Sequence, residues 1–308
     1  MTDNRHSWIK RGLTAGLFYL LSIAPRLIGR PKRMPGKFYA HRGLHDLSLG
    51  IPENTMAAFR RAVEHGYGIE LDVQLTKDGQ VVAAHDFDLK RICGVEKDVD
   101  ELTYEELKAL PVLGTAEHIP LFQDVLDLVD GKVPLLVEIK YKHVGSSICR
   151  KAAELLDHYS GSYCIESFHP VALMWFRKYR PYTVRGQLGM NFHKDDGRVH
   201  PVYYFPRHLL TNFLTKPDFI AYDHHARSAL SLTICRVVFG IPCFAWTVKS
   251  PREYYACEHI FDYFIFEGFL PEESDIRNCS LSVQNGASAR KELLPRTLFS
   301  IFFSDFPS

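Results

Sequence analysis

Linkers, net charge and paired cysteines are all scarce in this chain of 308 residues, and each absence excludes a class of protein. No stretch rich in glycine, serine or proline divides the middle of the sequence, so one large domain is favoured over two. The formal net charge is +1 and no long basic stripe is present, which argues against a nucleic-acid partner. The seven cysteines include no C-x-x-C pair, so neither a disulfide framework nor a cysteine zinc site is expected, and a reducing compartment is favoured.

The sequence also lacks an uncharged apolar run of full membrane-spanning length. Residues 12–25 are apolar and uncharged, but as a helix they rise only about 21 Å, against about 30 Å of hydrocarbon. The longer segment 8–28 is long enough, yet it contains Lys10, Arg11 and Arg26. Three alternatives remain: a membrane anchor that lies in the interface or spans it, a buried helix that caps the bottom of the main domain, and a secretory signal peptide. The anchor is favoured, and the signal peptide ranks third because Pro25 follows its small-x-small motif.

After residue 36, short apolar runs rich in β-formers alternate with helical patterns. We expect strands at residues 37–41, 68–75, 81–85, 134–139, 163–167, 183–190, 219–222, 243–248 and 263–266. We expect helices at residues 55–65, 104–110, 121–129, 147–158, 170–179, 229–239 and 251–259. This alternation predicts an α/β fold, a (β/α)₈ TIM barrel formed by residues 37–308, with the apolar and basic segment 1–36 as a helix outside it. A doubly wound sheet is the alternative, but no glycine-rich phosphate loop follows the first strand.

Two stretches interrupt the alternation. Residues 191–216 contain several aromatic residues and two prolines, and are expected to form a long loop of the kind that often covers a barrel site. The tail after Leu281 is polar and then ends in an apolar run, for which a core strand, a patch against the N-terminal helix and a second membrane contact remain open.

Acidic side chains stand where the strands end. Glu70 and Asp72 are two positions apart on one strand, so they face the same side and repel each other unless a hard cation or an ion pair compensates. Glu138 ends another strand with Lys140 on the same face. Because the carboxyl ends of barrel strands meet at one rim, the three carboxylates are expected to form an all-oxygen site for Mg²⁺ or Ca²⁺. Lys140 would lie beside this site as a fixed charge for a phosphate oxygen.

Two histidines occupy similar positions. His41 and His85 each end an apolar strand, where a lone histidine is usually only a hydrogen-bonded structural residue. Two of them beside three carboxylates suit the two proton transfers of phosphodiester cleavage. Arg42 offers planar two-point contact to a phosphate. The other histidines, His45 among them, lack a comparable setting and are not predicted as site residues; the His224–His225 pair is the most open of these because it follows a strand.

Residues 41–86 also carry a family resemblance. They read HRG, nine residues, ENT, three residues, F, and then GxxxELDVxLTKDGxxVxxHD, which resembles the glycerophosphodiester phosphodiesterases. Weaker matches follow at residues 119–121, 138–140, 166–168 and 246–248, so the likeness covers residues 38–267.

The resemblance implies a TIM-barrel enzyme that hydrolyses glycerophosphodiesters to sn-glycerol 3-phosphate and an alcohol. It implies one divalent cation, Mg²⁺ or Ca²⁺, held by Glu70, Asp72 and Glu138. It implies an acid–base pair formed by His41 and His85. It implies substrate contacts from Arg42 and Lys140 to the phosphate and from Phe168 and Trp246 to the glycerol. Glu53 and Asn54 are expected to support the site, with Asn54 capping the helix that starts near Thr55.

Three departures from the family pattern stand out. Lys249 follows Val248 where asparagine is usual, and residues 266–271 replace the usual Thr-Asp-x-Pro end of the last strand. The region between Asp88 and Ile119 is short, so the family's inserted domain is expected to be reduced. The first two departures are expected to affect head-group preference without touching the metal or acid–base positions.

Alternative functions remain open at this point. The closest is a lysophospholipase D that acts on membrane lysolipids, suggested by the apolar N-terminal segment and the aromatic loop. Another is a non-catalytic, membrane-tethered binding module, and a third is a structural barrel whose carboxylates form ion pairs. The sequence favours a cytoplasmic protein that associates with a membrane through residues 8–28.

Overall fold

The structure, a computed structural model, describes residues 2–29, 34–142, 145–190 and 204–271. Residues Met1–Phe269 form one compact unit, and a second unit starts at Leu270. The tail after Leu281, for which three alternatives were open, lies outside the described residues.

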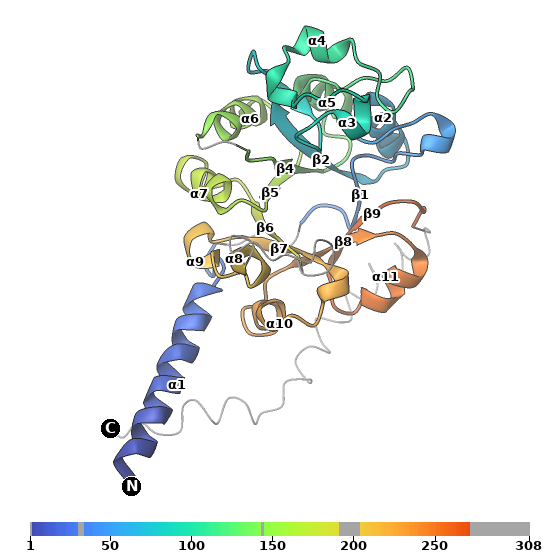
Figure 1. Cartoon of the computed structure of the whole chain (residues 1–308). Helices are drawn as coiled ribbons and strands as arrows, with labels where there is room; N and C mark the ends of the chain where they lie inside the picture. Colours follow the sequence, from blue (N-terminus) through green and yellow to red (C-terminus); the bar gives the residue numbers. More distant parts are fainter. Residues whose placement is uncertain (1, 30–33, 143–144, 191–203, 272–308) are drawn as a thin grey trace. The chain divides into compact units, whose positions relative to one another are not determined.

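Eight parallel strands close into a barrel. In ring order they are β1 (Phe38–Ala40), β2 (Gly68–Leu75), β4 (Leu135–Ile139), β5 (Tyr163–Ser167), β6 (Arg185–Gly189), β7 (Phe219–Asp223), β8 (Cys243–Val248) and β9 (Tyr263–Phe266). The ring closes because β1 pairs with both β2 and β9 (Figure 1). A short strand, β3 (Val81–Ala83), runs antiparallel to β2. The predicted (β/α)₈ barrel is confirmed, and all nine expected strands are present.

Helices surround the barrel because each has one apolar face. They are α2 (Met56–Glu64), α5 (Phe122–Val129), α6 (Ser147–Asp157), α7 (Pro170–Tyr179), α10 (Leu230–Val237) and α11 (Pro251–Cys257) (Figure 1). In α5 the buried residues are Phe122, Val125, Leu126 and Val129, the spacing of one helix face. These faces pack against outward strand residues such as Ile69, Leu71 and Val73.

The opposite faces of the strands fill the barrel interior. Tyr39, Leu136, Cys164, Phe219 and Phe244 belong to this second core. Because side chains alternate along a strand, the same inward face of β2 presents Glu70 and Asp72. The apolar interior therefore gives way to carboxylates toward the carboxyl ends of the strands, where a site is expected.

The region between Asp88 and Ile119 has a small core of its own. It contains α3 (Lys90–Cys93), η2 (Val99–Glu101) and α4 (Tyr104–Lys108). Ten buried residues form the cluster, among them Ile92, Leu107 and Ile119. Although short, this region is a packed insertion.

The expected loop at residues 191–216 is only partly described. Residues 191–203 lie outside the described ranges, but the remainder contains two short helices, α8 (Tyr204–Arg207) and α9 (Asn212–Thr215). The described part of this segment lies between β6 and β7, as expected of a loop between strands, but it contains these two helical turns. The buried side chains of Asn212 and Thr215 hold α9 in place.

The N-terminal segment forms α1 (Thr2–Ser22), outside the barrel as predicted. Its apolar residues Leu13, Leu17, Phe18 and Leu21 are exposed, which argues against a buried cap. Within the described ranges, no helix has both the length and the apolar character needed to cross a bilayer. An interfacial helix and a signal peptide are not tested by this result.

Candidate active site

The structure brings the three predicted metal ligands together. Asp72 on β2 and Glu138 on β4 are register partners, and Glu70 lies two residues before Asp72 on the same inward face. All three carboxylates are buried, and their oxygen atoms lie within 4.8 Å of one another. Lys140 Nζ lies 3.0 Å from Asp72 Oδ1 and 3.0 Å from Glu138 Oε2. The acidic residues thus meet at one rim, with the predicted phosphate-binding lysine between two of them.

The surroundings of the three carboxyl groups raise the pKa of two of them and lower the pKa of the third. Burial, together with the neighbouring carboxylates Asp72 and Glu138, raises the pKa of Glu70 well above its ordinary value. Burial also raises the pKa of Glu138, although Lys140 opposes the shift. Burial would raise the pKa of Asp72 as well, but the charges of Lys140, His85 and Arg42 outweigh it and lower that pKa. A divalent cation among these oxygens would relieve the crowding, so the donor set fits Mg²⁺ or Ca²⁺.

A fourth carboxyl group, Glu166, faces the same space. It is the register partner of Glu138 on β5, and burial and the neighbouring acids raise its pKa well above the ordinary value. Its Oε2 is buried and makes no hydrogen bond to any described residue. The sequence marked Glu166 only as part of a weak family match; its place beside Glu138 follows from strand register and could have been recognised from it.

Arg42 lies in the left-handed region, with φ of 53°, directly after β1. Its backbone N–H donates to Glu70 Oε2 at 3.0 Å, and its Nη1 donates to Glu53 Oε1 at 2.6 Å. Its Nε is 3.6 Å from Asp72 Oδ2 and makes no hydrogen bond among the described residues. Glu53 thus holds the guanidinium beside the acidic centre.

Asn54 has a different role from the one expected. Thr55 occupies the N-cap position of α2, and Asn54 instead donates from Nδ2 to Asp72 Oδ2 at 3.0 Å. The capping prediction is therefore wrong, and Asn54 orients a carboxylate of the acidic centre.

Each predicted catalytic histidine has one ring nitrogen held by a carboxylate. His41 Nδ1 lies 2.6 Å from Glu267 Oε2, and His85 Nδ1 lies 2.6 Å from Asp86 Oδ1. Because the carboxylate accepts a hydrogen bond that Nδ1–H donates, Nε2 of each neutral ring carries the lone pair. Burial lowers the pKa of His41, which the hydrogen bond to Glu267 opposes. The charge of Asp72 acts on both rings.

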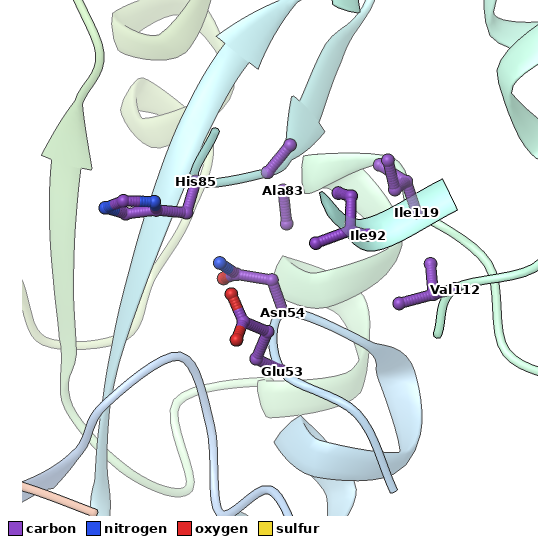
Figure 2. Close-up of a pocket in the computed structure, with 8 residues that line it drawn as sticks. Glu53, Asn54, Ala83, His85, Ile92, Val112 and Ile119 are labelled. Carbon is purple, nitrogen blue, oxygen red and sulfur yellow. The ribbon is translucent and has the colours of Figure 1, made fainter. Parts of the chain in front are cut away.

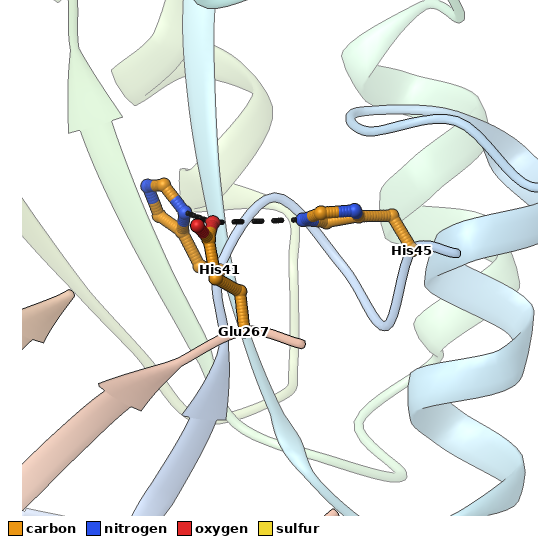
Figure 3. Close-up of side chains that lie close together, drawn as sticks. All are labelled: His41, His45 and Glu267. Atoms are coloured by element: carbon orange, nitrogen blue, oxygen red, sulfur yellow. Dashed lines mark hydrogen bonds and ion pairs between the residues drawn. The ribbon is translucent and has the colours of Figure 1, made fainter. Parts of the chain in front are cut away.

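The contact with Glu267 overturns one expectation. The changed end of β9 was expected to leave the acid–base positions untouched, yet Glu267 bonds His41 directly (Figure 3). The other departure, Lys249, is 2.6 Å from Glu267 Oε1 through its Nζ. The two departures from the family pattern therefore pair with each other in space, next to His41.

Aromatic side chains lie toward the carboxyl ends of two strands, Phe168 just after β5 and Trp246 on β8. The rings of Phe168 and Trp246 meet edge to face at 5.6 Å. A pocket lined by His85 has Glu53 and Asn54 on one side and, on the other, Ile92, Val112 and Ile119 from the core of the insertion (Figure 2).

Comparisons with known proteins agree with this geometry. The family model described as "Glycerophosphoryl diester phosphodiesterase family" matches residues 41–263. A glycerophosphodiester phosphodiesterase of Bacillus altitudinis is 36% identical over 179 residues, which cover 52% of this chain and 69% of that protein. A lysophospholipase D of Homo sapiens is 34% identical over 157 residues, 46% of this chain and 48% of that protein. The crystal structure of a glycerophosphodiester phosphodiesterase from Thermotoga maritima is 26% identical with a TM-score of 0.59, covering 76% of this chain and 95% of that one.

Proposed function

This chain belongs to the glycerophosphoryl diester phosphodiesterase family, and from that premise we propose that it hydrolyses soluble glycerophosphodiesters to sn-glycerol 3-phosphate and an alcohol, with His41 and His85 as the acid–base pair. The observation that carries the proposal is the pair of histidines beside one carboxylate cluster, each with Nδ1 held by a carboxylate. A fixed Nδ1 leaves Nε2 ready to accept or donate a proton.

In this mechanism Glu70, Asp72 and Glu138 would hold one Mg²⁺ or Ca²⁺, which would supply positive charge to the phosphodiester and to its transition state. Arg42 and Lys140 contact the phosphate oxygens. Phe168 and Trp246 line the glycerol side. One histidine takes a proton from the nucleophile and the other protonates the leaving oxygen. The nucleophile is water or the neighbouring 2-hydroxyl of the glycerol, and the same two histidines serve either route.

The test is release of glycerol 3-phosphate from glycerophosphocholine and glycerophosphoethanolamine with Mg²⁺, Ca²⁺ or EDTA. We expect metal-dependent release that His41→Ala and His85→Ala each lower by about 10²–10⁴-fold, the usual contribution of a general acid or base. His158→Ala, an exposed histidine after α6, is the matched control and should keep full activity. Circular dichroism must show that all three variants fold. Wild-type turnover in both site variants would refute the acid–base assignment.

A second candidate is a lysophospholipase D, favoured by the likeness to the human enzyme of that name and by the exposed apolar residues of α1. Turnover of lysophosphatidylcholine micelles well above that of glycerophosphocholine would support it. If turnover of the micelles is equal to or lower than turnover of glycerophosphocholine, soluble diesters are the preferred substrates.

We also propose where the protein works. Residues 1–36 are a segment separate from the catalytic domain of residues 37–308, and residues 8–28 contact a membrane surface from the cytoplasm. The six cysteines within the described residues form no disulfide bond, as is usual in a reducing compartment.

A further inference from the structure

We propose that His41, His45 and Glu267 form a second metal site, selective for Zn²⁺ or a similar borderline-soft ion, through which zinc inhibits the enzyme. The three residues converge at the junction of β1 and β9, the parallel pair that closes the barrel. Their ligand atoms lie within 4.8 Å of one another (Figure 3). As inhibition of the catalytic site, the inference rests on the proposed function; as a binding site, it stands on geometry alone.

One nitrogen of each histidine ring lies near the same carboxylate oxygen of Glu267. Glu267 Oε2 is 2.6 Å from His41 Nδ1 and 3.7 Å from His45 Nε2. Bonds of about 2.0–2.1 Å to a tetrahedral zinc ion place ligand atoms about 3.3 Å apart. The contact of Glu267 with His41 must therefore open by about 0.7 Å and its contact with His45 must close by about 0.4 Å, changes that side-chain rotation can supply.

His45 is held by Glu267 more loosely than His41 is. Its Nε2 is buried and makes no hydrogen bond to any described residue, and it points at Glu267 across a gap too long for one. A metal ion between this nitrogen and the carboxylate would replace the long contact with two short metal–ligand bonds.

The ligand chemistry separates this site from the acidic centre. Glu70, Asp72 and Glu138 offer only oxygen, which suits Mg²⁺ or Ca²⁺, whereas two imidazoles and one carboxylate are a common zinc set. The two sites share the barrel rim but no ligand. Lys249, at 2.6 Å from Glu267 Oε1, opposes the cation and keeps the affinity moderate.

Occupancy of this site would disable His41. Zinc on Nδ1 takes the position of the proton shared with Glu267, and the ring then keeps its remaining proton on Nε2 near neutral pH. A ring in that state can no longer accept a proton, so one of the two transfers stops. Magnesium or calcium at the acidic centre would not restore it.

The experiment titrates ZnCl₂ into the full chain by calorimetry with saturating Mg²⁺, and repeats the titration with His45→Ala and with the matched control His158→Ala. We expect one zinc per chain, an affinity at least tenfold weaker in His45→Ala, and no change in the control. Lys249→Asn should bind zinc several-fold more tightly. Unchanged zinc affinity in His45→Ala would overturn the proposal.

Activity gives the second measurement. His45→Ala should keep its turnover without zinc and need at least tenfold more zinc for half inhibition. Equal inhibition of His45→Ala and wild type, relieved by excess Mg²⁺, would place the inhibitory zinc at the acidic centre and refute the regulatory claim. Calorimetry requires no turnover, so an inactive protein that binds zinc through His45 would refute the proposed function and leave the zinc site standing.

Discussion

At the scale of single residues, the acidic centre is defined by an imbalance of charge. Four buried carboxyl groups, Glu70, Asp72, Glu138 and Glu166, face two cations, Arg42 and Lys140. Asp72 alone has a lowered pKa, because both cations and His85 act on it. The other three have raised pKa values, so without a metal they hold protons at pH values where an exposed carboxyl group has lost its own.

This imbalance predicts metal binding that competes with protons. A raised pKa means that, as the pH falls, Glu70 and Glu138 become protonated before an exposed carboxyl group would, and a cation must then expel those protons. Affinity for Mg²⁺ or Ca²⁺ should therefore weaken as pH falls, by up to about tenfold per unit for each proton released. Calorimetry in buffers of different ionisation enthalpy would measure both the affinity and the proton count. Affinity that is flat between pH 8 and pH 5, with no proton released, would contradict the prediction.

At the scale of elements, the packing between neighbouring strands depends on a glycine. Gly186 on β6 is the register partner of Phe219 on β7, and the Phe219 ring fills the space where a side chain would stand. An added Cβ would lie 2.0 Å from Phe219 Cε2, too close for any side chain. Phe219 is itself fully buried in the barrel interior, so it has little room to move.

Gly186→Ala is therefore expected to lower the free energy of unfolding by about 1–3 kcal/mol, the usual cost of overpacking a core. The control is Gly16→Ala in α1, where a Cβ meets nothing within 4 Å. Alanine is favoured over glycine inside a helix, so this control should be neutral or slightly stabilising. Urea unfolding followed by fluorescence would measure both variants. A Gly186→Ala protein as stable as wild type would show that the interior can relax.

The elements themselves were predictable, whereas contacts between distant elements were not. The apolar run at residues 68–75 predicts both ends of β2 correctly. The rule that parallel strands end at one rim predicts that Glu138 lies beside Asp72. His41 and Glu267 are 226 positions apart, and their contact depends on how the last strand closes against the first. Local patterns carry no information about that closure, so Glu267 was placed away from the acid–base pair.

At the scale of the whole Met1–Phe269 unit, the attachment of α1 bears on the choice of substrate. Arg26, just after the helix, binds Asp218 at 3.2 Å, immediately before β7 begins. Ile23 and Ala24 accept hydrogen bonds from Asn212 and Lys216. The segment after α1 is thus fixed at the amino end of β7, whereas the proposed catalytic residues follow the carboxyl ends of strands. An anchor at that end does not by itself hold the catalytic rim against a bilayer, which favours soluble diesters over lysolipids.

The exposed apolar residues of α1 nevertheless predict membrane association. Leu17 and Phe18 are 60% and 73% exposed, and Lys10 and Arg11 precede them. Burying one such side chain in an acyl layer contributes about 1.5–3 kcal/mol, and each nearby basic residue adds about 1 kcal/mol on an anionic surface.

The full chain should therefore sediment with phosphatidylserine-containing vesicles, and the double variant Leu17→Gln, Phe18→Gln should lose at least tenfold in partitioning. Thr14→Gln is the matched control and should sediment like wild type. Glycerophosphocholine turnover should be equal in all three proteins, because the helix attaches away from the rim. Equal sedimentation of the double variant and wild type would show that α1 does not contact the membrane.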